Sequence, residues 1–228
     1  MIILGIESAL PQGMVFLGED EKILSSRSFS SFSSSVQLIP GIESVLNETG
    51  ISRDRLDLVV VSTGPGSFTG IRIGLSLAKT LAFCLNLAVV GAPTLDCIAF
   101  SVPFSGYICP LIKAYRNSFF SAFFKKEKEK IQKISNYLFL SFEEISKSAS
   151  HFLPDKKVTF ILPPGERGNL IKEDEDFFLI EDKVSIQKAF LKWGLMRFFS
   201  KMVDDPLTLS PIYVSEPLID RRVKRWKI

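Results

Sequence analysis

The chain carries a glycine-rich run between an apolar segment and a helical pattern: Thr63-Gly64-Pro65-Gly66-Ser67-Phe68-Thr69-Gly70-Ile71-Arg72-Ile73-Gly74. The β-branched residues at 56–61 predict a buried strand, and the apolar repeat at 71–85 predicts a helix. A strand, a glycine loop and a helix in this order can surround an anion with backbone N–H groups. The same order also forms tight turns that bind nothing. The spacing matches neither a Walker A loop nor a dinucleotide fingerprint.

The anion interpretation predicts a nucleotide site at the loop and at the end of the first predicted strand, residues 2–6. Glycines there let the backbone adopt positive φ and approach a ligand closely, and Ser67 or Thr69 can cap the next helix. A carboxylate at the strand end, Glu7, or Asp96 further on could hold Mg²⁺. The alternative for Glu7 is a solvated strand end. The predicted nucleotide-binding residues are Glu7, Ser8, Gly64, Gly66 and Ser67.

Small residues recur every four positions along the predicted helix, at Gly70, Gly74, Ala78 and Ala82, which places them on one face. A glycine inside a helix costs about 1 kcal/mol relative to alanine, so two of them indicate close packing. That face could pack on a neighbouring helix of the same chain. It could equally form a groove that receives a helix of another protein, and both interpretations stay open on the helix pattern alone.

Residues 73–92 are about as long as a membrane span, with Lys79 as the only charge. Lys79 would lie well inside the bilayer, and Asn86 interrupts the run. Residues 87–90 fit a short buried strand better. We therefore expect no membrane segment.

Length and composition predict an ordinary globular protein. The chain has 228 residues and is 46% hydrophobic, enough for one large domain or two small ones. Its three cysteines, Cys84, Cys97 and Cys109, lie in apolar surroundings, which predicts reduced core thiols of a cytoplasmic protein. His151 is the only histidine, so no His-x-x-x-His metal pair can form, and no nucleophile elbow accompanies it. We therefore expect His151 to be a surface or capping residue rather than a catalytic one, and we expect no histidine metal site.

Positive charge is concentrated at the end of the sequence. The net charge is +3, but residues 220–228 alone carry +4, which leaves the remainder near −1. This balance does not indicate a nucleic-acid-binding body. The tail is a solvated end, or it contacts phosphate while Trp226 stacks on a base or on a protein surface.

The pattern divides the chain into a first half, residues 1–103, and a second half, residues 104–228, with a basic tail at 216–228. Strands followed by alternating helices and strands indicate mixed sheets with helical cover, an α/β class. The predicted strands are 2–6, 14–17, 23–29, 56–62, 87–90, 107–114, 119–125, 130–140, 157–162 and 177–180. The predicted helices are 36–48, 71–85, 96–101, 142–148 and 184–202.

Residues 62–74, followed by Ala78-Lys79, resemble the signature of the TsaB (YeaZ) family. Ile3-Leu4-Gly5-Ile6-Glu7-Ser8-Ala9 resembles that family's first strand, although Glu7 stands where an aspartate is usual. The resemblance covers residues 1 to about 100. A weaker resemblance to the end of the family's sequence lies at Pro211-Ile212-Tyr213-Val214. It implies a two-lobed fold of the actin-like ATPase superfamily (ASKHA, ribonuclease H-like), with a mixed sheet and helices in each lobe.

The resemblance also implies a function. Such proteins are non-catalytic subunits that dimerise with the catalytic TsaD subunit and work with the ATPase TsaE. The complex makes N6-threonylcarbamoyladenosine at position 37 of tRNAs that read ANN codons. The same helices could form a homodimer when the partner is absent. The residues predicted at the partner interface are Val36, Ile39, Glu43, Gly70, Arg72, Gly74, Ala78 and Ala82.

One alternative from another class stays open, an ATP-binding or ATP-hydrolysing enzyme of the same superfamily. In that case the loop at residues 64–70 holds phosphate and Glu7 holds Mg²⁺. For the non-catalytic subunit, no cofactor is required, and ATP or ADP with Mg²⁺ would bind weakly. The catalytic relative carries a histidine metal pair, which a chain with one histidine cannot form.

Overall fold

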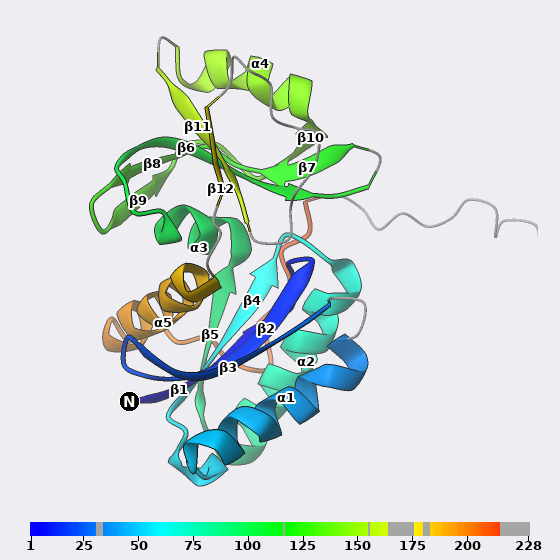
Figure 1. Ribbon diagram of the computed structural model, residues 1–228, viewed down its shortest axis with the longest axis vertical. Coiled ribbons are helices and arrows are strands. Elements are labelled where there is room, and N and C mark those ends of the chain that lie inside the picture. Colours follow the sequence, from blue (N-terminus) through cyan, green and yellow to red (C-terminus); the bar gives the residue numbers. More distant parts are fainter. Residues whose placement is uncertain (31–33, 116, 155, 164–175, 180–182, 215–228) are drawn as a thin grey trace, which may run out of the picture.

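The computed structural model describes residues 1–214 except 31–33, 116, 155, 164–175 and 180–182. Figure 1 shows two lobes, each a twisted sheet with helices on it. The strands of the first lobe are β1 (Ile2–Glu7), β2 (Gln12–Glu19), β3 (Lys22–Ser30), β4 (Leu58–Gly64) and β5 (Ala88–Pro93). The strand order of this sheet is β3-β2-β1-β4-β5. β1–β2 and β2–β3 pair antiparallel, whereas β1–β4 and β4–β5 pair parallel.

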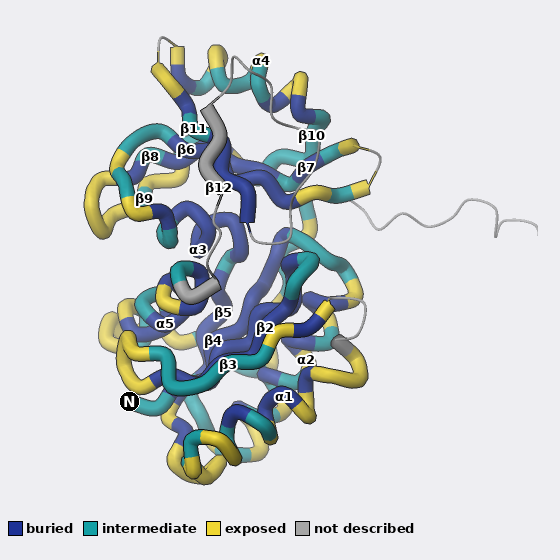
Figure 2. Tube along the Cα trace, in the orientation of Figure 1, coloured by how far each residue is buried: buried dark blue, intermediate teal, exposed yellow. Residues whose placement is uncertain are grey.

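Helices cover both faces of this sheet. α1 (Ser34–Thr49) and α2 (Phe68–Leu85) cover one face, and α3 (Thr94–Ser101) and α5 (Lys183–Phe199) cover the other. Alternation along β1 explains the two cores, because Leu4 and Ile6 face α1 and α2 while Ile3 faces the α3–α5 side. The central strands are buried on both faces, as Figure 2 shows in dark blue. A short 3-10 helix, η2 (Arg53–Arg55), precedes β4.

The second lobe repeats the plan of the first. Its strands are β6 (Gly106–Lys113), β7 (Ser118–Ser121), β8 (Phe124–Glu127), β9 (Lys130–Lys133), β10 (Leu138–Ser141), β11 (Val158–Leu162) and β12 (Asp176–Leu179). The order β10-β7-β6-β11-β12 matches that of the first sheet, and β8 and β9 form an added hairpin on β6. α4 (Phe142–Phe152) covers this sheet through Phe142 and Ile145. The predicted class, a mixed sheet with helices in each lobe, is confirmed.

Local signals explain where the key helices begin and end. Ser67 caps α2, as predicted for this position, because its side chain accepts a hydrogen bond from the N–H of Gly70 at 3.2 Å. Asn86 ends α2 in the left-handed conformation, with φ of 51°. Ser141 and Glu144 form a reciprocal capping box at the start of α4.

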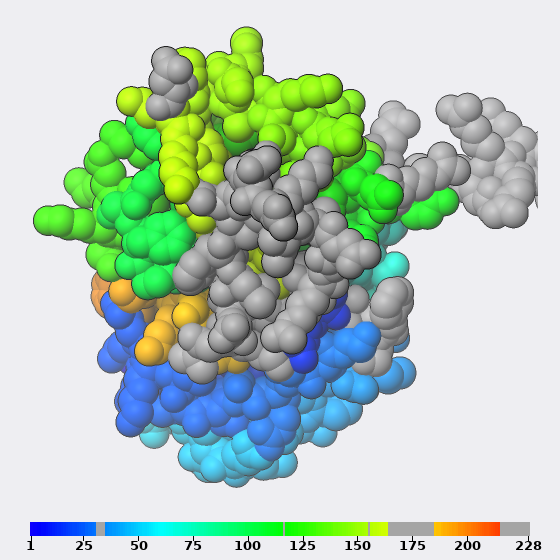
Figure 3. All heavy atoms as spheres, turned by 45° about the horizontal axis from the view of Figure 1, so that its top comes forward, coloured from blue at the N-terminus to red at the C-terminus, as the bar shows by residue number. Residues whose placement is uncertain are grey.

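The structure corrects three sequence predictions. The strands predicted at 119–125 and 130–140 each split in two, because the chain turns between β7 and β8 and between β9 and β10. α5, predicted within the second half, packs on the sheet of the first lobe and against α3. Figure 3 shows α5 in orange between blue residues of the first lobe and green residues from the middle of the chain. The basic tail at 216–228 lies outside the described residues.

α2 is the one helix among the described residues whose length and apolar composition would allow it to cross a membrane. In the structure it packs on β4 and β1, with one side buried in the core of the first lobe. The apolar character that imitates a span therefore reflects a helix that packs on a sheet.

Candidate functional site

The glycine loop between β4 and α2 packs on the chain's own first hairpin. The N–H of Ser67 donates to the carbonyl oxygen of Ala9 at 2.8 Å. A Cβ on Gly66 would lie 2.3 Å from that same oxygen, so only glycine fits there. Gly64 adopts φ of +92°, which turns the chain toward α2. The loop therefore uses its glycines and an amide to join the end of β1 to α2.

The small-residue face of α2 is sealed by the chain itself, so its predicted role as a docking face is wrong. Gly70, Gly74, Ala78 and Ala82 are all buried. A Cβ on Gly70 would lie 2.0 Å from the carbonyl oxygen of Ser8, and one on Gly74 would lie 2.2 Å from the Ser8 hydroxyl. The four-residue spacing thus allows α2 to approach the end of β1 closely. The spacing therefore predicted close packing correctly, but the element that packs on this face belongs to the same chain and not to another protein.

Glu7 is a fully buried carboxyl group at the carboxyl end of β1. Its Oε1 accepts hydrogen bonds from the N–H groups of Ala9 at 2.7 Å and Leu10 at 3.0 Å. Burial raises the pKa of Glu7 from 4.5 to about 7, against the opposing effect of these hydrogen bonds. Glu7 is therefore neither a solvated strand end nor a free carboxylate, and it holds the turn between β1 and β2.

Asp96, the second carboxylate predicted for Mg²⁺, already has partners from the second lobe. The Tyr137 hydroxyl donates to its Oδ2 at 2.5 Å, and Lys133 Nζ lies 3.7 Å from its Oδ1. Burial raises the pKa of Asp96, although both partners oppose the change. Among the residues the structure describes, no group of three or more His, Cys, Asp or Glu side chains could hold a metal ion.

The outer sides of α1 and α2 form a different surface, which we call the outer helical face. The two helices pack side by side on one face of the first sheet (Figure 1). Val36 is 68% exposed and Ile39 57% exposed. On α2, an open groove of about 400 Å³ runs along the same side. We define this face by Val36, Ile39 and Glu43 of α1 and by Arg72, Ile73, Ser76, Leu77 and Thr80 of α2.

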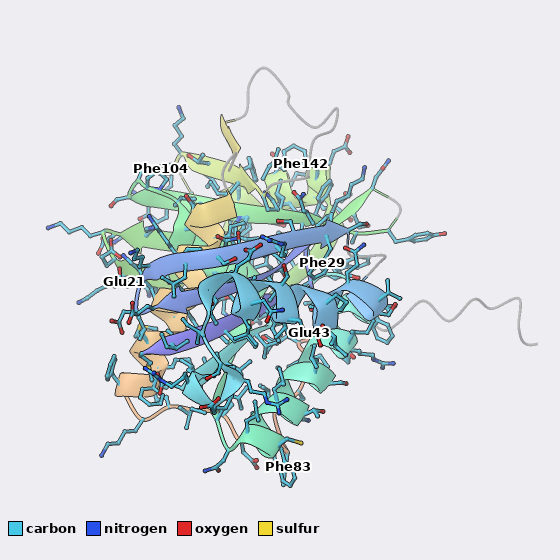
Figure 4. All side chains as sticks on the ribbon, turned by 60° about the horizontal axis from the view of Figure 1, so that its bottom comes forward. Glu21, Phe29, Glu43, Phe83, Phe104 and Phe142 are labelled. Carbon is cyan, nitrogen blue, oxygen red and sulfur yellow. The ribbon has the colours of Figure 1, made fainter. Side chains whose placement is uncertain are left out.

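Four of the eight residues predicted for a partner interface lie on this face: Val36, Ile39, Glu43 and Arg72. Sequence reasoning missed the other groove residues of α2 and also Phe83, which is 69% exposed near the end of the helix. Figure 4 shows Phe83 projecting from the end of α2, away from the sheets, and Glu43 on α1. The apolar positions on nearly every side of α2 were the available signal, since one sheet can bury only one side.

The cysteines divide into two groups. Cys97 and Cys109 are buried, and burial raises the pKa of both thiols. Cys84 is exposed in the last turn of α2, so its predicted place in the core is wrong.

Solved structures define the class of protein. YeaZ from Pseudomonas aeruginosa superposes with a TM-score of 0.72, covering 93% of this chain and 99% of that one at 15% identity. The activator of the 2-hydroxyisocaproyl-CoA dehydratase from Clostridium difficile, solved with bound ADPNP, superposes with a TM-score of 0.55 at 10% identity, covering 93% of this chain and 100% of that one. With two sheets of the same strand order, these neighbours show the two-lobed actin-like ATPase fold that the resemblance implied.

Sequence comparisons show the family. The family model described as TsaD: tRNA N6-adenosine threonylcarbamoyltransferase matches residues 28–200, more than half of the chain. The tRNA threonylcarbamoyladenosine biosynthesis protein TsaB of Bacillus subtilis is 33% identical over 127 residues, which are 55% of this chain and 56% of that protein. The chain thus spans about half the length of the curated relatives it matches. This chain belongs to the TsaB (YeaZ) family.

Proposed function

We propose that this chain is a non-catalytic subunit that docks on a TsaD-type threonylcarbamoyltransferase through its outer helical face. The observation that carries the proposal is the exposure of Val36 and Ile39 on α1, the helix that packs against α2 and its open groove. Apolar side chains removed from water contribute about 25 cal/mol per Å². A surface made of two packed helices suits docking of one or two helices from a partner.

The proposal gives this chain a structural role in the reaction. Within the described residues, the buried carboxyls Glu7 and Asp96 are held by internal partners. The only histidine, His151, lies exposed on α4, in the second lobe. The transferase subunit would therefore carry the chemistry, while this chain holds it in an active arrangement. The product would be N6-threonylcarbamoyladenosine at position 37 of tRNAs that read ANN codons, with a TsaE-type ATPase and tRNA joining through the complex. We place this work in the cytoplasm.

Nucleotide binding stays a prediction. The Ser67 amide is already bonded to Ala9, and Glu7 accepts two backbone hydrogen bonds, so two of the five residues predicted to bind a nucleotide have other partners. A titration of the purified chain with Mg-ATP should show weak binding or none, and no turnover. Robust ATP hydrolysis by the chain alone would favour the enzyme alternative.

A second copy of this chain could cover the same apolar face when the partner is absent. The apolar residues Val36, Ile39, Ile73 and Leu77 would then be shielded in a homodimer. Adding the transferase should convert such a homodimer into a mixed complex, because both would use one face. Sedimentation before and after mixing separates the two states.

Reconstitution tests the function directly. The chain and the TsaD-type transferase from the same organism are purified separately and supplied with a threonylcarbamoyl donor and tRNA. The chain alone should modify no tRNA, and the transferase alone should modify little. Modification should rise at least tenfold when the two are mixed. Transfer by this chain without the transferase would contradict the proposal, as would a mixture no more active than the transferase alone.

A further inference from the structure

Arg72 on the outer helical face is held by two aromatic side chains that lie far apart in the sequence. Its Cζ lies 3.9 Å from the ring centroid of Phe68 and 5.7 Å from that of Tyr213. Its Nε donates to the Tyr213 hydroxyl at 2.8 Å, and the two ring centroids are 5.2 Å apart. A guanidinium has five N–H donors, so this geometry fixes the group and leaves its remaining donors available.

The segment that brings Tyr213 to α2 is itself anchored. The Ile212 N–H donates to the carbonyl oxygen of Thr63 at 2.8 Å. Lys79 Nζ donates to the carbonyl oxygens of Leu207 at 3.3 Å and Leu209 at 3.0 Å. Residues 207–213 therefore lie along α2, held both to the end of β4 and to the middle of the helix. The orientation of Arg72 is consequently set by the fold before any partner arrives.

The surroundings of Arg72 favour a carboxylate. Arg72 lines one side of the groove on α2, whose other lining residues carry no formal charge: Ile73, Ser76, Leu77 and Thr80. Within the part of the chain that the structure describes, Arg72 makes no ion pair with a carboxylate. A fixed guanidinium beside an uncharged, largely apolar groove is complementary to a helix with one acidic side chain among apolar ones.

We infer that Arg72 is the polar anchor of the docking surface and receives a carboxylate from an apolar helix of the partner. The inference rests on the proposed function, since it names the contact that fixes the partner's register. Arginine and tyrosine are enriched among the residues that dominate binding energy. Holding the guanidinium in advance reduces the side-chain entropy that binding must remove. The occupant is a helix of the transferase subunit rather than a second copy of this chain.

Binding measurements on three variants test the anchor. Arg72→Gln removes the charge, Tyr213→Phe removes only the hydroxyl that positions the guanidinium, and Arg55→Gln removes an exposed charge from η2, away from the outer helical face. Each variant is titrated with the transferase subunit at several salt concentrations. Arg72→Gln should weaken binding at least tenfold and flatten its salt dependence. Tyr213→Phe should weaken binding about threefold or more, and Arg55→Gln should bind like the wild type.

The outcomes separate the anchor from the docking proposal. If the wild type binds and Arg72→Gln binds within about twofold of it, the anchor is overturned while docking survives. If the wild type does not bind the transferase, both fall. If Arg72→Gln disrupts only self-association of this chain, a second copy is the occupant, which also overturns the inference. Because Arg72 is exposed, unchanged melting temperatures should confirm that all three variants fold.

Discussion

The carbonyl oxygen of Ser8 lies only 2.0 Å from the position that a Cβ on Gly70 would occupy. The end of β1 and the first turn of α2 are therefore in direct backbone contact. This contact leaves no room for a ligand or a foreign helix between them, and it turns the opposite side of α2 toward solvent.

A methyl group at residue 70 should destabilise the fold. The obstacle is backbone, which cannot rotate away, so Gly70→Ala should lower the free energy of unfolding by about 2 kcal/mol or more. Urea denaturation measures this change. The control is Ser76→Ala on the solvent side of α2, which should stay within about 0.5 kcal/mol of the wild type. Equal stability of the two variants would show that α2 does not pack on β1 as described.

Glu7 should make stability depend on pH. The ordinary pKa of a glutamate is 4.5, and burial raises the pKa of Glu7 to about 7 in the fold. The folded chain therefore binds this proton more tightly than the unfolded chain does. The stabilisation is complete below about pH 4.5 and is lost as the pH rises through about 7, by roughly 3 kcal/mol at most. Denaturation of the wild type and of Glu7→Gln between pH 5 and 8 measures the effect. The wild type should lose stability relative to the variant across this range, and parallel curves would contradict the burial of a titrating Glu7.

Two neighbouring lysines of β8 should differ sharply. Lys126 is only 6% exposed and donates to the carbonyl oxygens of Phe100 and Val102 at the end of α3, whereas Lys125 pairs with Glu127 at the surface. Lys126→Met should cost about 2 kcal/mol, because it leaves two carbonyl groups without their donor. Lys125→Met removes a surface ion pair and should cost about 0.5 kcal/mol or less. Thermal melting of the two variants distinguishes them. Equal losses of stability would contradict a role for Lys126 in binding the carbonyl groups at the end of α3.

One thiol of three should react in the folded protein. Cys84 is exposed, whereas burial raises the pKa of Cys97 and Cys109 and shields them from reagents. Titration with a disulfide reagent under native conditions should release one equivalent of the reagent's thiolate per chain. After denaturation it should release three equivalents. Cys84→Ser should abolish the native reaction. Rapid reaction of two or more thiols in the folded chain would contradict the core packing.

Local patterns were sufficient for most of the fold because they reflect local causes. The apolar run of β1, the cap at Ser67 and the buried run of β4 each predicted an element that the structure contains. Contacts between distant segments were not predictable. Tyr213 meets Arg72 across 141 residues, and α5 returns to the first lobe, and no spacing within either segment encodes these partners.

The site predictions failed where one pattern serves two purposes. A stripe of small residues indicates close approach by some neighbour, but it does not say which one. Here the neighbour is Ser8 of the same chain, so Gly70 and Gly74 are not available to a partner protein. Val36, Ile39, Glu43 and Arg72 were placed at the surface, where a partner could reach them.

The affinity between this chain and its transferase partner tests docking through the outer helical face most directly. Ser76→Arg places a bulky charge in the middle of that face, and Ser150→Arg places the same charge on the exposed side of α4 as a control. The account predicts a complex of the wild type and the Ser150→Arg variant with equal affinity, and binding at least one hundredfold weaker for Ser76→Arg. Equal affinity of all three proteins for the transferase would contradict it.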